Sequence, residues 1–133
     1  MPFDHWIPRS AAAAHGLEEV ARRAHNAAFE REELARFGAF FERVLPQPLN
    51  DEQRAAIVVD EDAALVVAAA GSGKTTLLLG KIAYLVRRGL ARPEEIVLLA
   101  FNNSVRAEIR DRLAGSHPGV AVHTFHSLGL HIV

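Results

Sequence analysis

The sequence contains no cysteine, which excludes disulfide bonds, thiolate metal sites and cysteine nucleophiles and is usual in a reducing compartment. Its longest apolar run, residues 63–70, is far shorter than the roughly 20 residues that a membrane span needs. The N-terminus lacks the basic region followed by an apolar region that marks a secretory signal. These absences favour a soluble, cytoplasmic protein with no membrane partner. A net charge of -1 gives no overall attraction to nucleic acid, so any such binding must come from local geometry.

The sequence does contain enough apolar residues to form one folded core. Of its 133 residues, 50% are hydrophobic and 23% are charged. Residues 1–45 are predicted to be a helical N-terminal segment, because apolar residues recur there at helical spacing. The residues expected on that apolar face are Leu17, Val20, Ala21, Ala24, Phe29, Leu34, Phe37, Phe40 and Phe41. Pro46 and Pro48 then stop helix propagation and indicate a linker.

From residue 46 onward the pattern alternates between helices and short apolar runs. Asn50 offers an N-cap to the first of these helices. The predicted helices are 51–58, 74–88 (closed by Gly89) and 104–113, and the predicted strands are 63–68, 96–101 and 120–123. Such an order is typical of an α/β fold, a parallel sheet with flanking helices. The apolar segment 125–132 has no polar tail after it, so we expect the front part of a longer protein.

The stretch AAAGSGKT, from Ala68 to Thr75, has the composition of a phosphate-binding loop. Two glycines let the backbone approach a triphosphate, the lysine can reach its β and γ phosphates, and the threonine hydroxyl can bind Mg²⁺. The predicted nucleotide-binding residues are Ala68, Ala69, Ala70, Gly71, Ser72, Gly73, Lys74, Thr75 and Thr76. Lys74 and Thr75 are the predicted catalytic residues, and Thr75 is the predicted Mg²⁺ ligand. The expected cofactors are ATP and Mg²⁺.

The apolar residues 57–59, followed by acidic residues, resemble a strand that ends in metal-binding carboxylates, but the spacing excludes such a strand here. A strand ending in acidic residues would have to lie parallel to the predicted strand 63–68, and parallel neighbours need a crossover of roughly a dozen residues. Only residues 60–62 separate the two, so they are predicted to form a turn. No other carboxylate follows an apolar strand. The chain is therefore expected to bind ATP better than it hydrolyses it.

Three further stretches resemble motifs of the UvrD/Rep-type superfamily 1 DNA helicases. LNDEQRAAI (49–57) resembles the glutamine motif, AFNNSVRAEIRDR (100–112) motif Ia, and TFHSLGL (124–130) motif Ib, all in family order around the phosphate loop. The upstream stretch AHNAAFEREELARFGAFF (24–41) and Thr76, where other members have arginine, resemble the helicase IV branch. Asn102-Asn103-Ser104 departs from the family's Thr-Asn-Lys, which removes a positive contact to DNA.

The resemblance implies that residues 46–133 are the front part of a RecA-like, P-loop NTPase motor domain of a 3′–5′ DNA helicase. Its partners would be single-stranded DNA and the remaining motor domains of the same protein. The Gln53 amide would select adenine, because it can donate one hydrogen bond and accept another side by side, which matches the edge of the base. Single-stranded DNA would contact Phe101, Asn103, Thr124 and His126, with the Phe101 ring stacking on a base.

Each of these assignments has a plainer alternative. Gln53 could be a helix-surface residue, Phe101 a core residue, and His126 a buried histidine bonded to backbone. His123, His126 and His131 lack the nearby carboxylates or thiolates that would favour a metal site. Arg106, Arg110 and Arg112 are expected on a solvated helix face. The whole protein could instead be the helicase subunit of a helicase–nuclease, or a nucleotide-binding interaction module that unwinds nothing.

Overall fold

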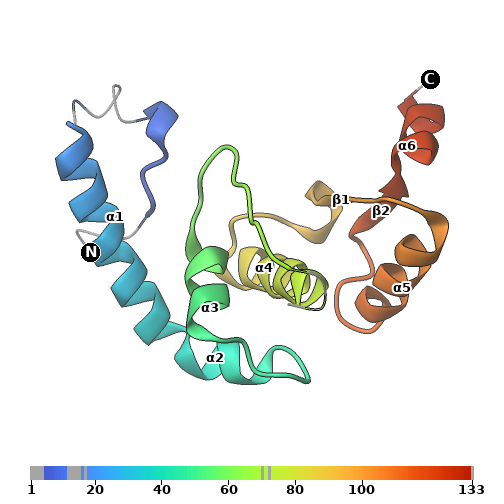
Figure 1. Cartoon of the computed structure of the whole chain (residues 1–133), viewed down its shortest axis with the longest axis horizontal. Coiled ribbons are helices and arrows are strands. Elements are labelled where there is room, and N and C mark those ends of the chain that lie inside the picture. Colours follow the sequence, from blue (N-terminus) through green and yellow to red (C-terminus); the bar gives the residue numbers. More distant parts are fainter. Residues whose placement is uncertain (1–4, 12–15, 17, 70, 72, 133) are drawn as a thin grey trace. The chain divides into compact units, whose positions relative to one another are not determined.

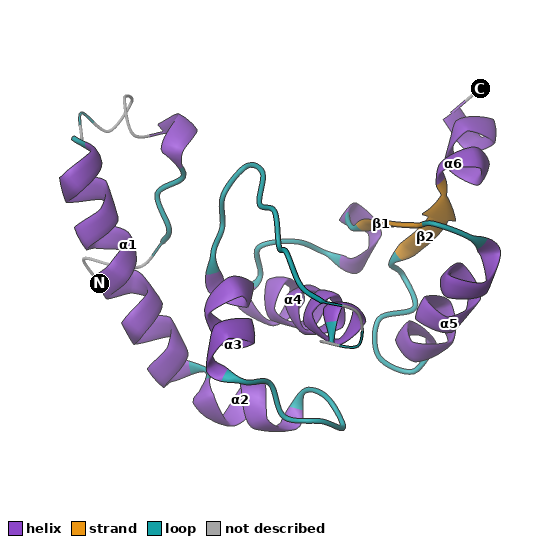
Figure 2. Ribbon diagram, in the orientation of Figure 1, coloured by secondary structure: helices purple, strands orange, loops and turns teal. Residues whose placement is uncertain are grey.

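The computed structural model describes residues 5–11, 16, 18–69, 71 and 73–132. The chain divides into two compact units, residues 1–80 and 81–133. In chain order the elements are η1 (Arg9–Ala11), α1 (Glu19–Arg36), α2 (Gly38–Arg43), α3 (Asp51–Val58), α4 (Lys74–Arg88), η2 (Pro93–Glu95), β1 (Val97–Ala100), α5 (Asn103–Ala114), β2 (Ala121–Thr124) and α6 (Phe125–Ile132) (Figure 1 and Figure 2). No helix within these described ranges is long and apolar enough to cross a bilayer.

Helix α1 buries a largely polar face, made of Arg22, Asn26, Phe29 and Glu33. The Asn26 side chain accepts a hydrogen bond from the Ile7 N–H and donates one to the Ile7 carbonyl, both at 2.9 Å. A helix that packs on extended backbone needs such polar groups, because buried backbone must keep its hydrogen bonds. The predicted apolar face was therefore wrong at its N-terminal end. Val20 is 79% exposed.

The aromatic residues at the α1–α2 junction do pack as the sequence predicted. The ring of Phe40 makes edge contacts with Phe37 and Phe41, with centroids 6.0 and 5.5 Å apart. Phe41 is completely buried. Edge-to-face pairs of this kind add to the apolar burial of the core of the first unit.

Helix α3 begins at a reciprocal cap. The Gln53 N–H donates to the Asn50 side chain at 2.8 Å, and the Asn50 N–H donates to Gln53 Oε1 at 3.0 Å. The predicted N-cap is confirmed, and the cap satisfies two amide groups that would otherwise lack helical partners. At the other end of the helix, Ile57 and Val58 are fully buried.

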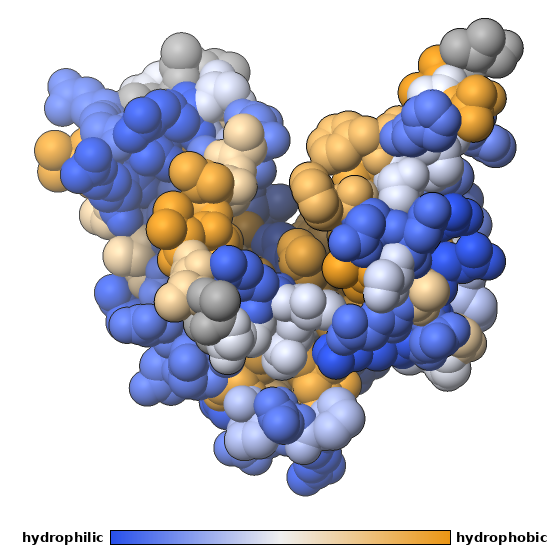
Figure 3. All heavy atoms as spheres, turned by 45° about the vertical axis from the view of Figure 1, so that its right-hand side comes forward, coloured by the Kyte–Doolittle hydropathy of each residue, from blue (hydrophilic) through white to orange (hydrophobic). Residues whose placement is uncertain are grey.

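Residues 63–68, predicted to be a buried strand, form no strand in the structure. Leu65 and Val67 are 89% and 87% exposed, and Figure 3 shows apolar atoms at the surface of the molecule. A strand is stable only when a neighbouring strand supplies hydrogen bonds and its apolar side chains are covered. Among the described residues the only paired strands are β1 and β2, so the predicted three-stranded sheet is corrected to two strands.

Helix α4 has the predicted bounds. It ends at Arg88 and is followed by Gly89, where φ is 76°, a conformation that glycine adopts without a steric penalty. The Leu90 N–H donates to the Leu85 carbonyl at 2.9 Å and completes the helix end. At Gly80 the helix is in direct contact with α3, since a Cβ placed there would lie 2.8 Å from Cδ1 of Ile57.

The second unit contains the parallel pair β1 and β2, with Val97 opposite Ala121 and Ala100 opposite Thr124. Helix α5 connects these strands and packs on both, as the sequence predicted, with bounds shifted by one residue. The core of this unit is formed by Ala100, Ile109, Leu113, Val120 and Val122. Helix α6, over residues for which we predicted no element, follows β2 directly and packs against it.

Candidate functional site

The phosphate-loop glycines adopt a backbone conformation that favours glycine. Gly71 and Gly73 have φ values of 77° and 83°, in the left-handed region that residues with a Cβ rarely enter. The predicted site residues Ala70 and Ser72 lie outside the described residues, while Ala68 and Ala69 belong to the loop that leads to Gly71. The sequence thus supplies glycine at the two described positions where the backbone needs it.

Gln53 lies against this loop. A Cβ placed on Gly73 would lie 3.0 Å from Nε2 of Gln53, which is closer than ordinary van der Waals contact. Because Oε1 of the same amide accepts the cap hydrogen bond from Asn50, the NH₂ end is the end that faces Gly73. Gln53 of the glutamine motif and Gly73 of the phosphate loop, twenty positions apart in the sequence, therefore meet in space.

Helix α4 starts directly after the loop, at Lys74. The Leu77 N–H donates to the Gly73 carbonyl at 2.8 Å, so the first helical turn is anchored on the loop. Lys74 is exposed, while Thr75 and Thr76 are half-buried. The amino end of a helix carries partial positive charge and amide donors, which suit an anion such as a phosphate group.

The four residues predicted to contact DNA lie together in the second unit. An open hollow of about 550 Å³ is lined by Phe101, Asn102, Asn103, Thr124, Phe125, His126, Ser127 and Leu130. The hollow lies where β1 and β2 end and α5 and α6 begin. Phe101 is 92% exposed and Phe125 is 72% exposed. Phe101 is therefore not a core residue of the described structure, which excludes the plainer alternative for this residue.

Thr124 and Ser127 hold the start of α6 by hydrogen bonds to each other's backbone. The Thr124 N–H donates to Ser127 Oγ at 2.8 Å, and the Ser127 N–H donates to Thr124 Oγ1 at 3.2 Å. Asn102 caps α5 by accepting from the Val105 N–H at 2.9 Å. Sequence reasoning missed the contribution of Asn102 and Ser127 to the hollow. The signal was available, since Asn102 is the N-cap of α5 and Ser127 is the third residue of α6, where a capping partner of Thr124 is expected.

The three arginines of α5 do not share one solvated face. Arg106 is half-buried, and its Nε donates to the Val122 carbonyl at 3.1 Å, so it braces β2. Arg112 pairs with Glu108 at 2.8 Å on the helix surface, and Arg110 is exposed. The prediction of a common solvated face was wrong for Arg106, because a nearby strand carbonyl offers it a partner.

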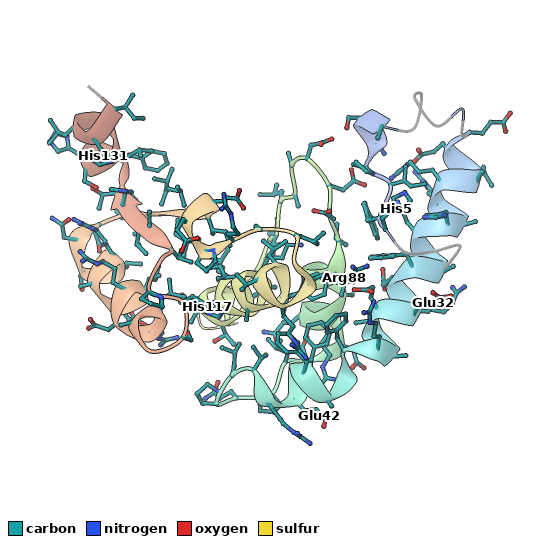
Figure 4. The ribbon with its side chains drawn as sticks, turned by 180° about the vertical axis from the view of Figure 1, so that it is seen from behind. His5, Glu32, Glu42, Arg88, His117 and His131 are labelled. Carbon is teal, nitrogen blue, oxygen red and sulfur yellow. The ribbon has the colours of Figure 1, made fainter. Side chains whose placement is uncertain are left out.

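Two histidines of the second unit, His123 and His131, lie close together at β2 and α6. The rings of His123 and His131 lie 5.5 Å apart, and His131 projects from the end of α6 (Figure 4). In the part of the chain that the structure describes, no three His, Cys, Asp or Glu side chains are grouped so that they could hold a metal ion.

Glu61, one of the acidic residues that imitate a metal-binding strand, is engaged in the first unit. It accepts hydrogen bonds from Trp6 Nε1 at 3.1 Å, the Arg9 N–H at 2.9 Å and Arg22 at 3.0 Å. Burial raises the pKa of Glu61, but these three hydrogen bonds and the Arg22 charge outweigh it and hold the pKa below its ordinary value. The carboxylate stays ionised and tied to the N-terminal residues.

A family of known proteins matches the part of the chain that contains these sites. The UvrD/REP helicase N-terminal domain model matches residues 49–133, which is more than half of the chain. The chain therefore belongs to the UvrD/REP helicase family. The matched range begins just before α3 and contains the phosphate loop and the hollow.

Three curated relatives are similar to the chain. DNA helicase IV of Escherichia coli (strain K12) is 42% identical over 119 residues, covering 86% of this chain and 17% of the relative. The ATP-dependent DNA helicase UvrD1 of Mycobacterium leprae (strain TN) is 42% identical over 64% of the chain and 12% of its own length. DNA helicase II of Escherichia coli (strain K12) is 40% identical over 60% of the chain and 12% of its own length.

The coverage of these matches differs in an informative way. Residues 49–133 alone cannot supply 86% of the chain, so the similarity to DNA helicase IV extends into the upstream helical segment. This agrees with the resemblance of residues 24–41 to the helicase IV branch. The chain spans less than a fifth of the length of any of the three relatives.

Proposed function

We propose that this chain is the ATP-binding N-terminal part of an ATP-dependent 3′–5′ DNA helicase that translocates on single-stranded DNA. The observation that carries the proposal is the meeting of Gln53 with Gly73 at the start of α4. A glutamine amide beside a phosphate loop places an adenine-reading group next to a triphosphate-binding group. Membership of the UvrD/REP helicase family supports the same conclusion.

The described residues fit ATP and Mg²⁺. Gly71 leaves the backbone open to phosphate oxygens, because a Cβ placed there would meet no atom within 4 Å, and Gly73 leaves room for the amide of Gln53 beside the loop. Lys74 would neutralise the β and γ phosphates, and Thr75 would hold Mg²⁺. The bound ion would supply positive charge that offsets the charge of the phosphates. Ala68, Ala69, Ala70, Ser72 and Thr76 complete the proposed loop contacts.

Single-stranded DNA is the proposed ligand of the hollow in the second unit. An exposed phenylalanine at a strand end can stack on any base, because every base has an aromatic face. Asn103 and His126 are exposed and can bond the DNA backbone. Thr124 is 9% exposed, and its Oγ1 accepts a hydrogen bond from the Ser127 N–H. Its proposed role is therefore to position the start of α6 beside the bound DNA strand.

Translocation would require the remaining motor domains of the same protein. ATP held by this chain would bridge to a second motor domain, and closure between them would move the strand past the hollow. Because Glu61 is tied to the N-terminal residues, this chain by itself is proposed to bind ATP without hydrolysing it efficiently.

The proposal is tested by titrating the chain with ATP·Mg²⁺ in the presence and absence of a short thymidine oligonucleotide. We expect oligonucleotide binding, and we expect Phe101→Ala to weaken it by about 1–3 kcal/mol, the usual contribution of one base stack. Leu90→Ala is the control, because Leu90 is exposed but lies outside the hollow. ATP binding without any oligonucleotide binding would refute the helicase proposal and favour a nucleotide-binding interaction module.

A further inference from the structure

The carboxylate of Glu61 is the meeting point of three donors from the N-terminal part of the chain. Trp6, Arg9 and Arg22 all bond it, at distances between 2.9 and 3.1 Å. The Arg22 side chain is 7% exposed and that of Glu61 is 22% exposed, so solvent screens this ion pair less than a surface pair. We call these four residues the Glu61 latch.

Additional bonds extend the latch to neighbouring segments. Arg22 also donates to the Ile7 carbonyl at 3.2 Å and to both carboxylate oxygens of Glu19 at 2.9 and 3.0 Å. Ser10 donates to the Asp62 carboxylate, next to Glu61 in the chain. In Figure 1 the dark-blue N-terminal segment accordingly lies beside the green loop that follows α3. His5 lies beside α1, where its carbonyl accepts a hydrogen bond from Nε2 of His25 at 2.9 Å (Figure 4).

Helix α3 connects the latch to the phosphate loop. Glu61 follows the last residue of α3 by three positions, and Gln53 lies in the first turn of the same helix. Eight helical residues span about 12 Å, so α3 bridges the distance between the latch and the phosphate loop. The buried residues Ile57 and Val58 fix the helix against its neighbours. The same helix thus carries the latch beyond its C-terminal end and, in its first turn, the amide that faces Gly73.

We propose that Glu61 is a positioning residue for the adenine side of the nucleotide site: by tying the C-terminal end of α3 to the N-terminal segment, it holds Gln53 against the phosphate loop. The proposal rests on the proposed function, because it requires that the loop binds ATP. It assigns the N-terminal segment a part in nucleotide recognition.

The test compares two ligands, ATP and inorganic tripolyphosphate, each with Mg²⁺, by calorimetric titration of the 133-residue chain. Tripolyphosphate occupies only the phosphate loop and has no base for Gln53 to contact. We expect Glu61→Gln to weaken ATP binding by about fivefold or more, as is common for coupled sites. The affinity for tripolyphosphate should change by less than about twofold. Asp60→Asn, on the same turn, is the matched control and should leave both affinities unchanged.

Two further variants complete the design. On a Gln53→Ala background, Glu61→Gln should cause no additional loss of ATP affinity, because the residue acts through Gln53. Trp6→Phe removes one donor to Glu61 while keeping a ring next to Phe29, so it tests the latch if Glu61→Gln does not fold. It should show the same selective loss for ATP at smaller amplitude.

The outcomes separate the inference from the function on which it rests. If Lys74→Ala binds ATP as tightly as the wild type, the proposed nucleotide site is wrong. If Lys74→Ala loses ATP but Glu61→Gln, or Trp6→Phe in its place, weakens both ligands equally or neither of them, the positioning role of Glu61 is overturned.

Discussion

Replacing Gly73 by alanine tests how Gln53 and the phosphate loop depend on each other. Gly73 has a φ of 83°, and an added Cβ would lie 3.0 Å from Gln53 Nε2. Gly71 has a φ of 77° with no atom within 4 Å of its added Cβ, and the same holds for Gly89 at 76°. The three substitutions share the backbone strain, and only the one at Gly73 displaces the glutamine.

The magnitudes follow from this difference. An L-residue in the left-handed region costs roughly 1–2 kcal/mol, so all three variants should unfold at lower urea concentration by a similar amount. Gln53 is a flexible side chain and can yield by a few tenths of an ångström, so Gly73→Ala should lose little further stability. Its ATP affinity should nevertheless fall more than its tripolyphosphate affinity, because the displaced amide no longer faces the adenine.

Urea unfolding followed by circular dichroism measures the first effect, and calorimetric titration with both ligands measures the second. Gly89→Ala, outside the loop, should bind both ligands as the wild type does. The reasoning is refuted if Gly73→Ala and Gly71→Ala change the ratio of ATP affinity to tripolyphosphate affinity by the same factor.

Three further outcomes are expected. Gly80→Ala should lower the free energy of unfolding by up to about 2 kcal/mol, because crowding against the buried Ile57 outweighs a helix-propensity gain of about 1 kcal/mol; a more stable variant in urea would contradict this packing. Asn50→Ala should cost about 1 kcal/mol in the same assay through loss of the α3 cap, and no loss would contradict the cap. Hydrogen bonds from Arg22 and Arg23 lower the pKa of Glu19 to about 2, and the pKa of Glu61 is also lowered. The stability that Glu19 adds is thus present above about pH 4.5 and lost as the pH falls towards 2, and the stability that Glu61 adds is lost as the pH falls through its lowered pKa. In urea unfolding at a series of pH values, the free energy of unfolding of Glu61→Gln should fall less steeply with decreasing pH than that of the wild type.

The local signals of the sequence predicted several elements well. Gly89 ends α4 because it adopts a positive φ, and Asn50 caps α3 because its side chain accepts an amide hydrogen bond. The alternation of strand and helix after residue 96 predicted the parallel pair, since each apolar strand is long enough to pair and each connection long enough to cross over. The helix ends depend on contacts within a few residues, and the strand pair follows from the order and lengths of consecutive elements.

The features that were missed depend on contacts between distant residues. An apolar run such as 63–68 has the composition of a strand, but a strand also requires a partner, which composition does not report. The buried face of α1 was missed because Arg22 and Asn26 read as surface residues until the backbone of Ile7 is beside them. The same applies to Glu61, whose three donors come from residues 39 to 55 positions away.

The central claim, that this chain binds ATP through its phosphate loop, is tested most directly by calorimetric titration of ATP·Mg²⁺ into the wild type, Lys74→Ala and Lys81→Ala. Both variants remove one lysine charge from α4, and only Lys74 adjoins the loop. We predict saturable binding to the wild type and to Lys81→Ala, and loss of binding in Lys74→Ala. Equal affinity in all three proteins, or no binding to the folded wild type, would contradict the claim.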